Sequence, residues 1–167
     1  ESKSFLAFDL GAESGRAVIG HLDNDRLRLE VVHRFPNGPV QVLDRLHWDV
    51  LRLWSEIKQG LNLAAKAYGK RLSSVGLDTW GVDFALLSRN DELLSNPLQY
   101  RDSRTEGILE KAFALVPREE IFAATGLQFM QINSLFQLLA MKLDKSPILD
   151  AADSLLMIPD LFHWLLT

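Results

Sequence analysis

Two short apolar runs near the N-terminus enclose a small, hydroxyl-bearing turn that could bind phosphate. The runs cover residues 5–8 and 17–20, and the turn holds Gly11, Ser14 and Gly15. Glycines allow backbone N–H groups to converge on an anion. The order is strand, turn, strand, so the turn belongs to a hairpin. An ordinary glycine hairpin would show the same spacing, so both interpretations stand on the residues alone.

A carboxylate precedes this turn. Asp9 ends the first apolar run and can face the mouth of the turn. Mg²⁺ in proteins is usually held by one or two carboxylates together with phosphate oxygens and water. A phosphate bound with Mg²⁺ is therefore the chemistry that this pattern favours.

A second group of polar and aromatic residues lies in the middle of the chain. Thr79, Trp80 and Gly81 follow an apolar run, with Asp83 next and Tyr100 further on. An aromatic ring can pack on the C–H face of a sugar, and a glycine lets the backbone approach its hydroxyls. Asp83 would accept hydrogen bonds from such hydroxyls. The alternative is a tight turn between strands with Trp80 in the core.

Ser103 and Glu106 have the spacing of a capping box at the start of a helix. Capping the helix would be a sufficient structural role for both residues, so we assign them no catalytic role. Asp102 and Arg104 either tie that helix start to a binding pocket or are structural.

These residues need a sheet and helices to position them. Apolar residues alternate with other residues over residues 27–35, which predicts a third strand after the two N-terminal ones. The three strands are expected to be sequential and antiparallel. Apolar residues at three- and four-residue steps predict a helix from Val50, with Asp49 as its cap and Gly69 at its end. Residues 72–77 and 82–87 read as further strands, which predicts a mixed sheet with a crossing helix.

The remainder of the chain is predicted to be mostly helical. The predicted helices cover residues 104–115, 118–125 and 133–143, and a last helix begins at Pro159. That last helix is apolar and needs a partner to cover it, so we expect the chain to be a piece of a longer protein.

Composition narrows the classes of function. The 167 residues fit one domain, and the net charge of -4 argues against a nucleic-acid partner. There is no cysteine, which excludes disulfides and thiolate metal sites. The sequence has no apolar run of the roughly 20 residues that a membrane span needs, so we expect no membrane partner.

Four segments together resemble the N-terminal domain of the FGGY carbohydrate kinases. They are DLGAESGR from Asp9, GLDTWGVDF from Gly76, YRDSRT from Tyr100 and LMIPD from Leu156. The resemblance covers residues 1–167 and implies an α/β, ribonuclease H-like domain of the actin and hexokinase type, with a mixed sheet and flanking helices. It implies an ATP- and Mg²⁺-dependent enzyme in the cytoplasm that phosphorylates the 1-hydroxyl of a ketose, L-rhamnulose in the most similar subgroup.

The resemblance also implies roles for residues. ATP phosphates would contact the hairpin, and Asp9 would face the metal through water. The sugar would contact residues around Gly81. No residue of this chain matches the catalytic base, which is expected beyond Thr167 in a C-terminal domain that is also the partner of this one. The implied phosphate-binding residues are Asp9, Gly11, Ala12, Glu13, Ser14, Gly15 and Arg16, and the implied sugar-binding residues are Thr79, Trp80, Gly81, Asp83 and Tyr100.

Two alternatives remain beside this interpretation. One is a kinase of the same family that acts on another ketose or polyol. The other is a sugar- or ATP-binding module of the same fold without enzymatic activity, because a fold does not by itself determine function.

Overall fold

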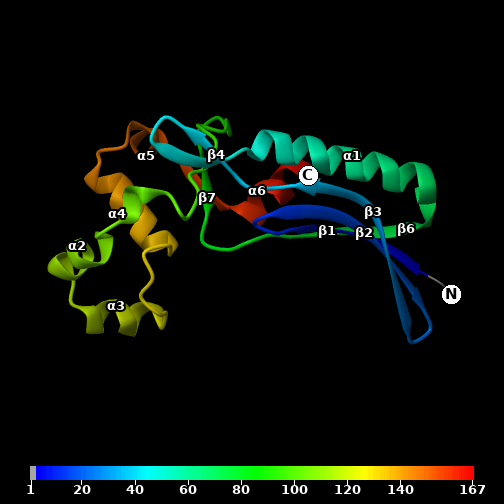
Figure 1. Ribbon diagram of the computed structural model, residues 1–167, viewed down its shortest axis with the longest axis horizontal. Helices are drawn as coiled ribbons and strands as arrows, with labels where there is room; N and C mark the ends of the chain where they lie inside the picture. The colour runs from blue at the N-terminus through cyan, green and yellow to red at the C-terminus, as the bar shows by residue number, and fades with distance from the viewer. Residues whose placement is uncertain (1–2) are drawn as a thin grey trace. The chain divides into compact units, whose positions relative to one another are not determined.

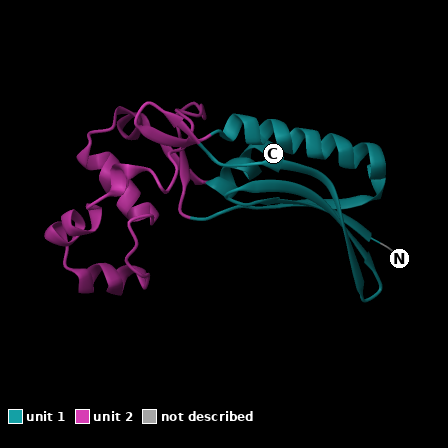
Figure 2. Cartoon of the chain, in the orientation of Figure 1, with its two compact units in different colours: residues 1–39, 49–81, 158–167 teal, residues 40–48, 82–157 magenta. Residues whose placement is uncertain are grey.

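The computed structural model describes residues 3–167, and the chain divides into two compact units. Unit 1 consists of residues 1–39, 49–81 and 158–167, and unit 2 of residues 40–48 and 82–157. Figure 2 shows the two units in different colours. The chain leaves unit 1 and returns to it twice, so each unit is assembled from segments that are distant in sequence.

Unit 1 is built on a four-stranded sheet with the order β3-β2-β1-β6. β1 pairs antiparallel with β2, β2 antiparallel with β3, and β6 pairs parallel with β1. The three sequential antiparallel strands and the mixed sheet are therefore confirmed. The strands are β1 (Lys3–Leu10), β2 (Ser14–Asp23), β3 (Arg26–Pro36) and β6 (Leu72–Asp78).

Helix α1 (Val50–Tyr68) runs along one face of this sheet (Figure 1). The Asp49 side chain caps it by accepting a hydrogen bond from the Arg52 amide at 3.0 Å. The helix ends at Gly69, which has a φ of 52°, and a short 3₁₀ turn, η1 (Gly69–Arg71), leads into β6. Both predicted caps are confirmed, because an oxygen acceptor and a glycine are what the two helix ends require.

The core of unit 1 lies between α1 and the sheet. The alternating residues Leu6, Phe8 and Leu10 of β1 are buried, as the period of a strand with one covered face requires. The buried stripe of α1 recurs at helical steps and consists of Val50, Leu53, Ile57, Gly60 and Ala64. Helix α6 (Ile158–Leu166) buries Ile158, Leu161 and Phe162.

Unit 2 contains two small sheets and several short helices. β4 (Pro39–Val42) pairs with β5 (Arg45–Trp48), and β7 (Phe84–Leu87) pairs antiparallel with β8 (Ser154–Met157). The helical segments are η2 (Ser103–Thr105), α2 (Ile108–Leu115), α3 (Arg118–Thr125), α4 (Ser134–Leu143) and α5 (Pro147–Ala151). One apolar cluster joins α2 to α4 through residues such as Ile108 and Phe136, and another surrounds Phe84, Leu86 and Met141.

Two sequence predictions for unit 2 were right only in part. The strand predicted for residues 82–87 is present as β7, but it pairs with β8 and does not join the large sheet. All four residues of β7 are buried, and an apolar run of this kind does not specify which distant strand it joins.

The helix predicted for residues 104–115 begins at Ile108. Asp102, and not Ser103, caps the preceding 3₁₀ turn by accepting from the Arg104 amide. Gly107 then adopts a φ of 67°, which separates this turn from α2. The capping box is therefore absent, because the carboxylate one residue earlier satisfies the free amide.

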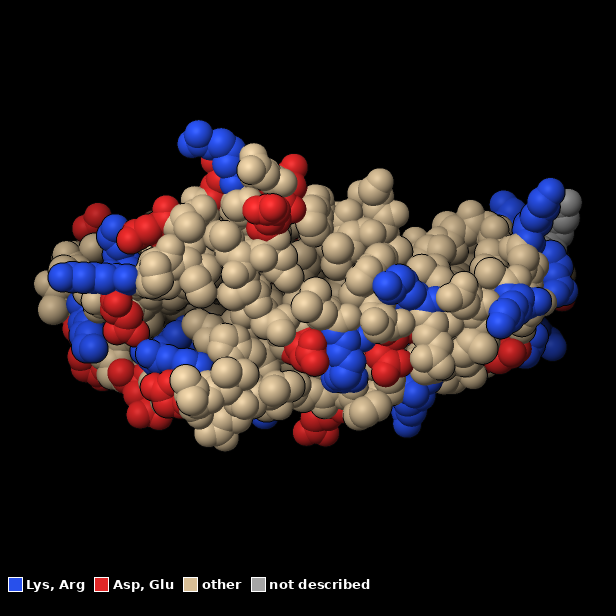
Figure 3. Space-filling view, turned by 90° about the horizontal axis from the view of Figure 1, so that it is seen from above, with Lys and Arg blue, Asp and Glu red and all other residues tan. Residues whose placement is uncertain are grey.

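Charged side chains of both signs are interspersed with uncharged surface on the face that Figure 3 shows. Within residues 3–167, no helix has both the length and the apolar character to cross a membrane.

The close approach of α1 to the sheet gives a prediction for stability. A Cβ atom on Gly60 would lie 2.7 Å from Cε1 of Phe8 and 3.0 Å from Cβ of Ala17. Gly60→Val should lower the free energy of unfolding by about 1–3 kcal/mol, because overpacking forces the core apart. Urea unfolding followed by circular dichroism measures this. The matched control is Gly38→Val, since a Cβ on Gly38 meets nothing within 4 Å; equal midpoints for the two variants would contradict the prediction.

Candidate functional site

The predicted phosphate-binding hairpin is formed by β1, β2 and the turn between them. Leu10 lies opposite Gly15 and Asp9 opposite Arg16 in the antiparallel register. The turn is closed by a hydrogen bond of 2.9 Å from the Gly11 amide to the Ser14 carbonyl. The Gly11 amide is therefore used inside the turn and cannot donate to an anion.

Space, and not the conformational freedom that the sequence suggested, requires glycine at position 15, and a side chain at position 11 would make a tight contact. Neither residue has a positive φ among the described residues. A Cβ on Gly15 would lie 2.3 Å from Cε2 of Phe35, and one on Gly11 would lie 3.2 Å from the Ser14 oxygen. Gly15 thus lets the Phe35 ring of β3 cover the hairpin.

The tip of the turn is where an anion could be bound. Ala12 is half-buried and Glu13 is exposed. In the described part of the chain, the amides of these two residues donate to no backbone carbonyl. Together with the exposed Ser14, they are the donors that the hairpin can offer to a phosphate.

Asn37 holds the turn in place, and the sequence reasoning missed it. Its Nδ2 donates to the Gly11 carbonyl at 2.7 Å, and its backbone N–H donates to the Glu13 carbonyl at 2.9 Å. The only signal in the sequence was the Pro36-Asn37-Gly38-Pro39 loop. Asparagine is common in such loops because its amide bonds to nearby backbone groups.

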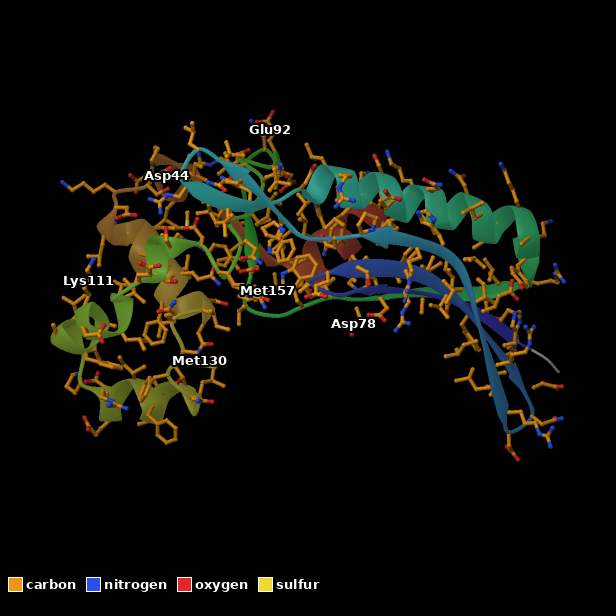
Figure 4. The ribbon with its side chains drawn as sticks, viewed as in Figure 1. Asp44, Asp78, Glu92, Lys111, Met130 and Met157 are labelled. Atoms are coloured by element: carbon orange, nitrogen blue, oxygen red, sulfur yellow. The ribbon has the colours of Figure 1, made fainter. Side chains whose placement is uncertain are left out.

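Charged residues form a row across three strands beside the turn. Arg16 contacts Asp9 from both Nε (2.8 Å) and Nη2 (2.7 Å), and both side chains are about half exposed. Asp78 is the register neighbour of Asp9 on the parallel strand β6. Figure 4 shows Asp78 at the end of β6, on the face of the sheet opposite α1.

The carboxylates of this row are compatible with a magnesium ion that also binds phosphate. Within residues 3–167, no group of three or more His, Cys, Asp or Glu side chains could hold a metal ion by itself. Mg²⁺ needs no such cage, since it commonly keeps several waters and takes one or two carboxylates plus phosphate oxygens. Asp9, with Asp78 beside it, supplies that donor set.

Thr79, Trp80 and Gly81 follow directly after β6. The Thr79 hydroxyl donates to the Trp80 carbonyl at 2.9 Å, and the Trp80 side chain is half-buried. Gly81 is exposed, does not have a positive φ, and a Cβ placed on it would meet nothing within 4 Å. The described chain itself therefore does not require glycine at position 81.

Asp83 belongs to unit 2 and is fully buried. Its Oδ2 accepts from the indole Nε1 of Trp48 at 2.5 Å and from the Tyr100 amide at 3.3 Å. Its Oδ1 accepts from Nε2 of Gln137 at 3.0 Å. A carboxylate bonded in this way fixes the segments around it, and its burial does not suit the direct sugar contact that the sequence suggested.

Asp102 and Arg104 form a buried charged pair in unit 2. The two charged groups approach to 3.3 Å, and both side chains are at most 2% exposed. Burial alone would raise the pKa of Asp102, but amide donors from Leu46 and Arg104 and the Arg104 charge outweigh it and lower the pKa. Arg104 also donates to the Gln99 carbonyl at 3.1 Å and to Oε1 of Gln137 at 2.5 Å.

A cavity of about 300 Å³ lies within unit 2 and was not predicted. Its walls combine apolar side chains with two arginines. No predicted sugar-binding residue lines it, and its residues come from separate stretches of sequence, which no local pattern could assemble. The lining includes Arg45, His47, Phe84, Leu86, Pro97, Leu98, Arg104, Gln137, Met141, Asp144, Ser146 and Ile148.

Comparison with known proteins matches the chain to one family over almost its whole length. Residues 4–167 match the model of the FGGY family of carbohydrate kinases, N-terminal domain. The chain is 42% identical over 162 residues to a rhamnulokinase of Oceanobacillus iheyensis and 43% identical over 162 residues to one of Halalkalibacterium halodurans. Each alignment covers 97% of this chain and 34% of the relative, so the chain spans about a third of those proteins.

Solved structures agree on the fold. A gluconate kinase from Lactobacillus acidophilus superposes with a TM-score of 0.79 at 15% identity, covering 93% of this chain and 31% of that one. A ligand-bound xylulose kinase from the same organism gives 0.77 at 15% identity, covering 92% and 31%. The mixed sheet with flanking helices is therefore the fold of sugar kinases, as the sequence predicted.

The buried pair gives a prediction on pH. Because the pKa of Asp102 is lowered in the folded state, its charged form contributes stability above the unfolded pKa of about 3.9, and this is lost as the pH falls through the folded pKa. Asp102→Asn should cost about 3–5 kcal/mol of unfolding free energy at pH 7, since it leaves Arg104 buried without its partner. The difference from the wild type should narrow below about pH 4.

Chemical unfolding of both proteins between pH 3 and 7 measures this difference. Asp144→Asn is the matched control, because Asp144 is exposed and lies 3.5 Å from Arg45. It should cost less than about 1 kcal/mol. A loss for Asp102→Asn that is equally small, or that stays constant with pH, would contradict the prediction.

Proposed function

Because the chain belongs to the FGGY family of carbohydrate kinases, we propose that it forms the N-terminal part of an ATP-dependent kinase that phosphorylates the 1-hydroxyl of L-rhamnulose. The observation that carries this proposal is the identity of 42% to a named rhamnulokinase over 97% of the chain. The catalytic base and most of the adenine site are assigned to sequence outside this chain. We assign the enzyme to the cytoplasm, because that compartment contains the ATP that the reaction needs.

The β1–β2 hairpin is the proposed site for the terminal phosphates of ATP. Phosphoryl transfer depends mainly on positioning and on neutralising charge. The amides of Ala12 and Glu13 and the Ser14 hydroxyl are the proposed donors, and Arg16 adds positive charge nearby. When bound, Mg²⁺ would neutralise charge on the phosphates, and Asp9 is the residue that would hold its water shell.

The proposed sugar contacts begin at Gly81. Its exposure, and the open space where a side chain would otherwise stand, leave its backbone accessible to a closely approaching hydroxyl. Thr79 and Trp80 flank this point in sequence. We assign Tyr100 to the sugar through its ring, and we assign Asp83 to holding the Tyr100 backbone in place.

Substrate choice tests the function directly. The full-length protein that carries this chain should phosphorylate L-rhamnulose with the highest kcat/KM among L-rhamnulose, D-xylulose, D-gluconate and glycerol. The isolated 167-residue chain should show no meaningful turnover, because the base is assigned elsewhere. A coupled ADP-release assay measures both. If the full-length protein prefers another of these compounds, that compound replaces L-rhamnulose as the proposed substrate. If the full-length protein binds a sugar without any turnover, the kinase proposal is refuted.

Asn37 tests the role of the hairpin. Asn37→Ala removes the 2.7 Å bond to the Gly11 carbonyl and should raise the KM for ATP by about 3- to 10-fold in the full-length enzyme, the effect of one lost hydrogen bond. The KM for the sugar should stay unchanged. Gly81→Leu is the opposite case, since it should raise the KM for the sugar and leave that for ATP unchanged. Equal effects of Asn37→Ala on both constants would count against the hairpin as a phosphate site.

A further inference from the structure

Strand β3 carries a row of exposed apolar side chains on one face. Leu27, Leu29 and Val31 are 64%, 65% and 52% exposed. The three alternate along the strand, so they point to the same face. A Cβ on Gly20 of β2 would lie 3.5 Å from Cδ1 of Leu27 and 3.7 Å from Cδ2 of Leu29, so both leucines lie over this neighbouring glycine. Exposed apolar side chains gathered in this way indicate an interaction surface.

The same strand lies at the edge of the unit 1 sheet. In the described part of the chain, β3 is the outermost strand and has β2 as its one neighbour. An edge strand presents backbone N–H and C=O groups to which another strand can add. The tip of the β2–β3 hairpin points away from α1 (Figure 1). A register shift opposite Ala17 and Val18 leaves Val32 without a counterpart, so residues 26–31 form the regular part of this edge.

Charged side chains alternate with the apolar ones and lie on the other face. Glu30 is on the side of α1, where it accepts a hydrogen bond of 2.7 Å from the Tyr68 hydroxyl. Arg28 lies 3.4 Å from Glu30 of its own chain, and the two side chains are 68% and 41% exposed. An ion pair of this length and exposure is weak, so both charges remain available to a partner.

The sequence of this edge is complementary to itself. When two copies of β3 pair antiparallel about a two-fold axis at Leu29, Arg28 of each copy lies opposite Glu30 of the other. On the apolar face, Leu27 then lies opposite Val31, and Leu29 opposite its own counterpart. Pairing centred on Arg28 would instead oppose two arginines, and pairing centred on Glu30 two glutamates, which is destabilising. The charges therefore select one register.

We propose that the β3 edge binds a second copy of this chain, which pairs antiparallel through residues 27–31 in this register. The contact uses the same surface on both copies and joins their sheets into one. A strand pair of this length buries little area, so the dimer should dissociate on dilution. Because these residues include none that we assign to ATP or sugar, the proposal is independent of the proposed kinase function.

Charge reversal tests the register in the full-length protein that carries this chain. In analytical ultracentrifugation, the wild type should pass from monomer to dimer between about 1 and 300 µM. Arg28→Glu opposes like charges in both halves of the contact, and so does Glu30→Arg. Each variant should raise the dissociation constant by at least about tenfold. An equimolar mixture of the two variants should associate as the wild type does, because every contact between them joins opposite charges again.

Arg26→Glu is the matched control, since it changes the net charge as Arg28→Glu does but lies outside residues 27–31. It should shift the dissociation constant by less than about twofold. Leu29→Lys opposes like charges on the two-fold axis, should weaken the dimer by at least about tenfold, and provides a second test if a charge-reversal variant fails to fold by circular dichroism.

Two results would overturn the proposal. The first is a full-length protein that stays monomeric at about 300 µM, which would leave the edge to the part of the protein that this chain does not span. The second is a dimer that tolerates Leu29→Lys, or a mixture of the two folded charge-reversal variants that stays monomeric.

Discussion

Unit 2 depends on the pairing of charges that its interior cannot leave unsatisfied. Asp83 and Asp102 are buried carboxylates, and Arg104 is a buried guanidinium. An unpaired charge in such a position costs several kcal/mol, so every segment that supplies a donor is fixed in place. The amides of Leu46 and Tyr100 and the Trp48 indole are oriented for this reason. Tyr100, which we assign to the sugar, thereby takes its position from electrostatics as well as from packing.

Gln137 connects this charged network to the backbone of Val82, whose φ of 66° lies in the left-handed region. Its Oε1 accepts from Arg104, while its Nε2 lies within 3.2 Å of Asp83 Oδ1 and of the Val82 and Ile132 carbonyls. The Gln137 side-chain amide has two protons for these three acceptors, so the hydrogen bonds are shared and a change in one of them affects the others. Substitutions at Arg104, Asp83 and Val82 should therefore be non-additive, as is usual for residues in one hydrogen-bond network.

The sequence predicted those features that local chemistry determines. The three N-terminal strands follow from alternation, and the caps of α1 follow from Asp49 and Gly69. What failed depended on distant partners. The apolar run of β7 is compatible with any sheet, and its pairing with β8 joins residues far apart in the chain. The burial of Asp83 could not be foreseen either, because its donors Trp48 and Gln137 lie far from it in sequence. The resemblance to the family predicted the parts of the fold that the periodicity of apolar residues could not.

The glycines of this chain fall into two groups, those that the fold itself explains and those that it does not. Gly60 and Gly15 stand where a side chain would collide with Phe8 or Phe35, so the fold itself accounts for them. Gly81 has open space around it and an ordinary φ, so neither packing nor backbone conformation accounts for it. It is followed by a valine that is held in a disfavoured conformation. Backbone strain of this kind is typical of sites that bind a ligand. The physical case for ligand contact is therefore stronger at Gly81 than at Gly15, whose presence packing already explains.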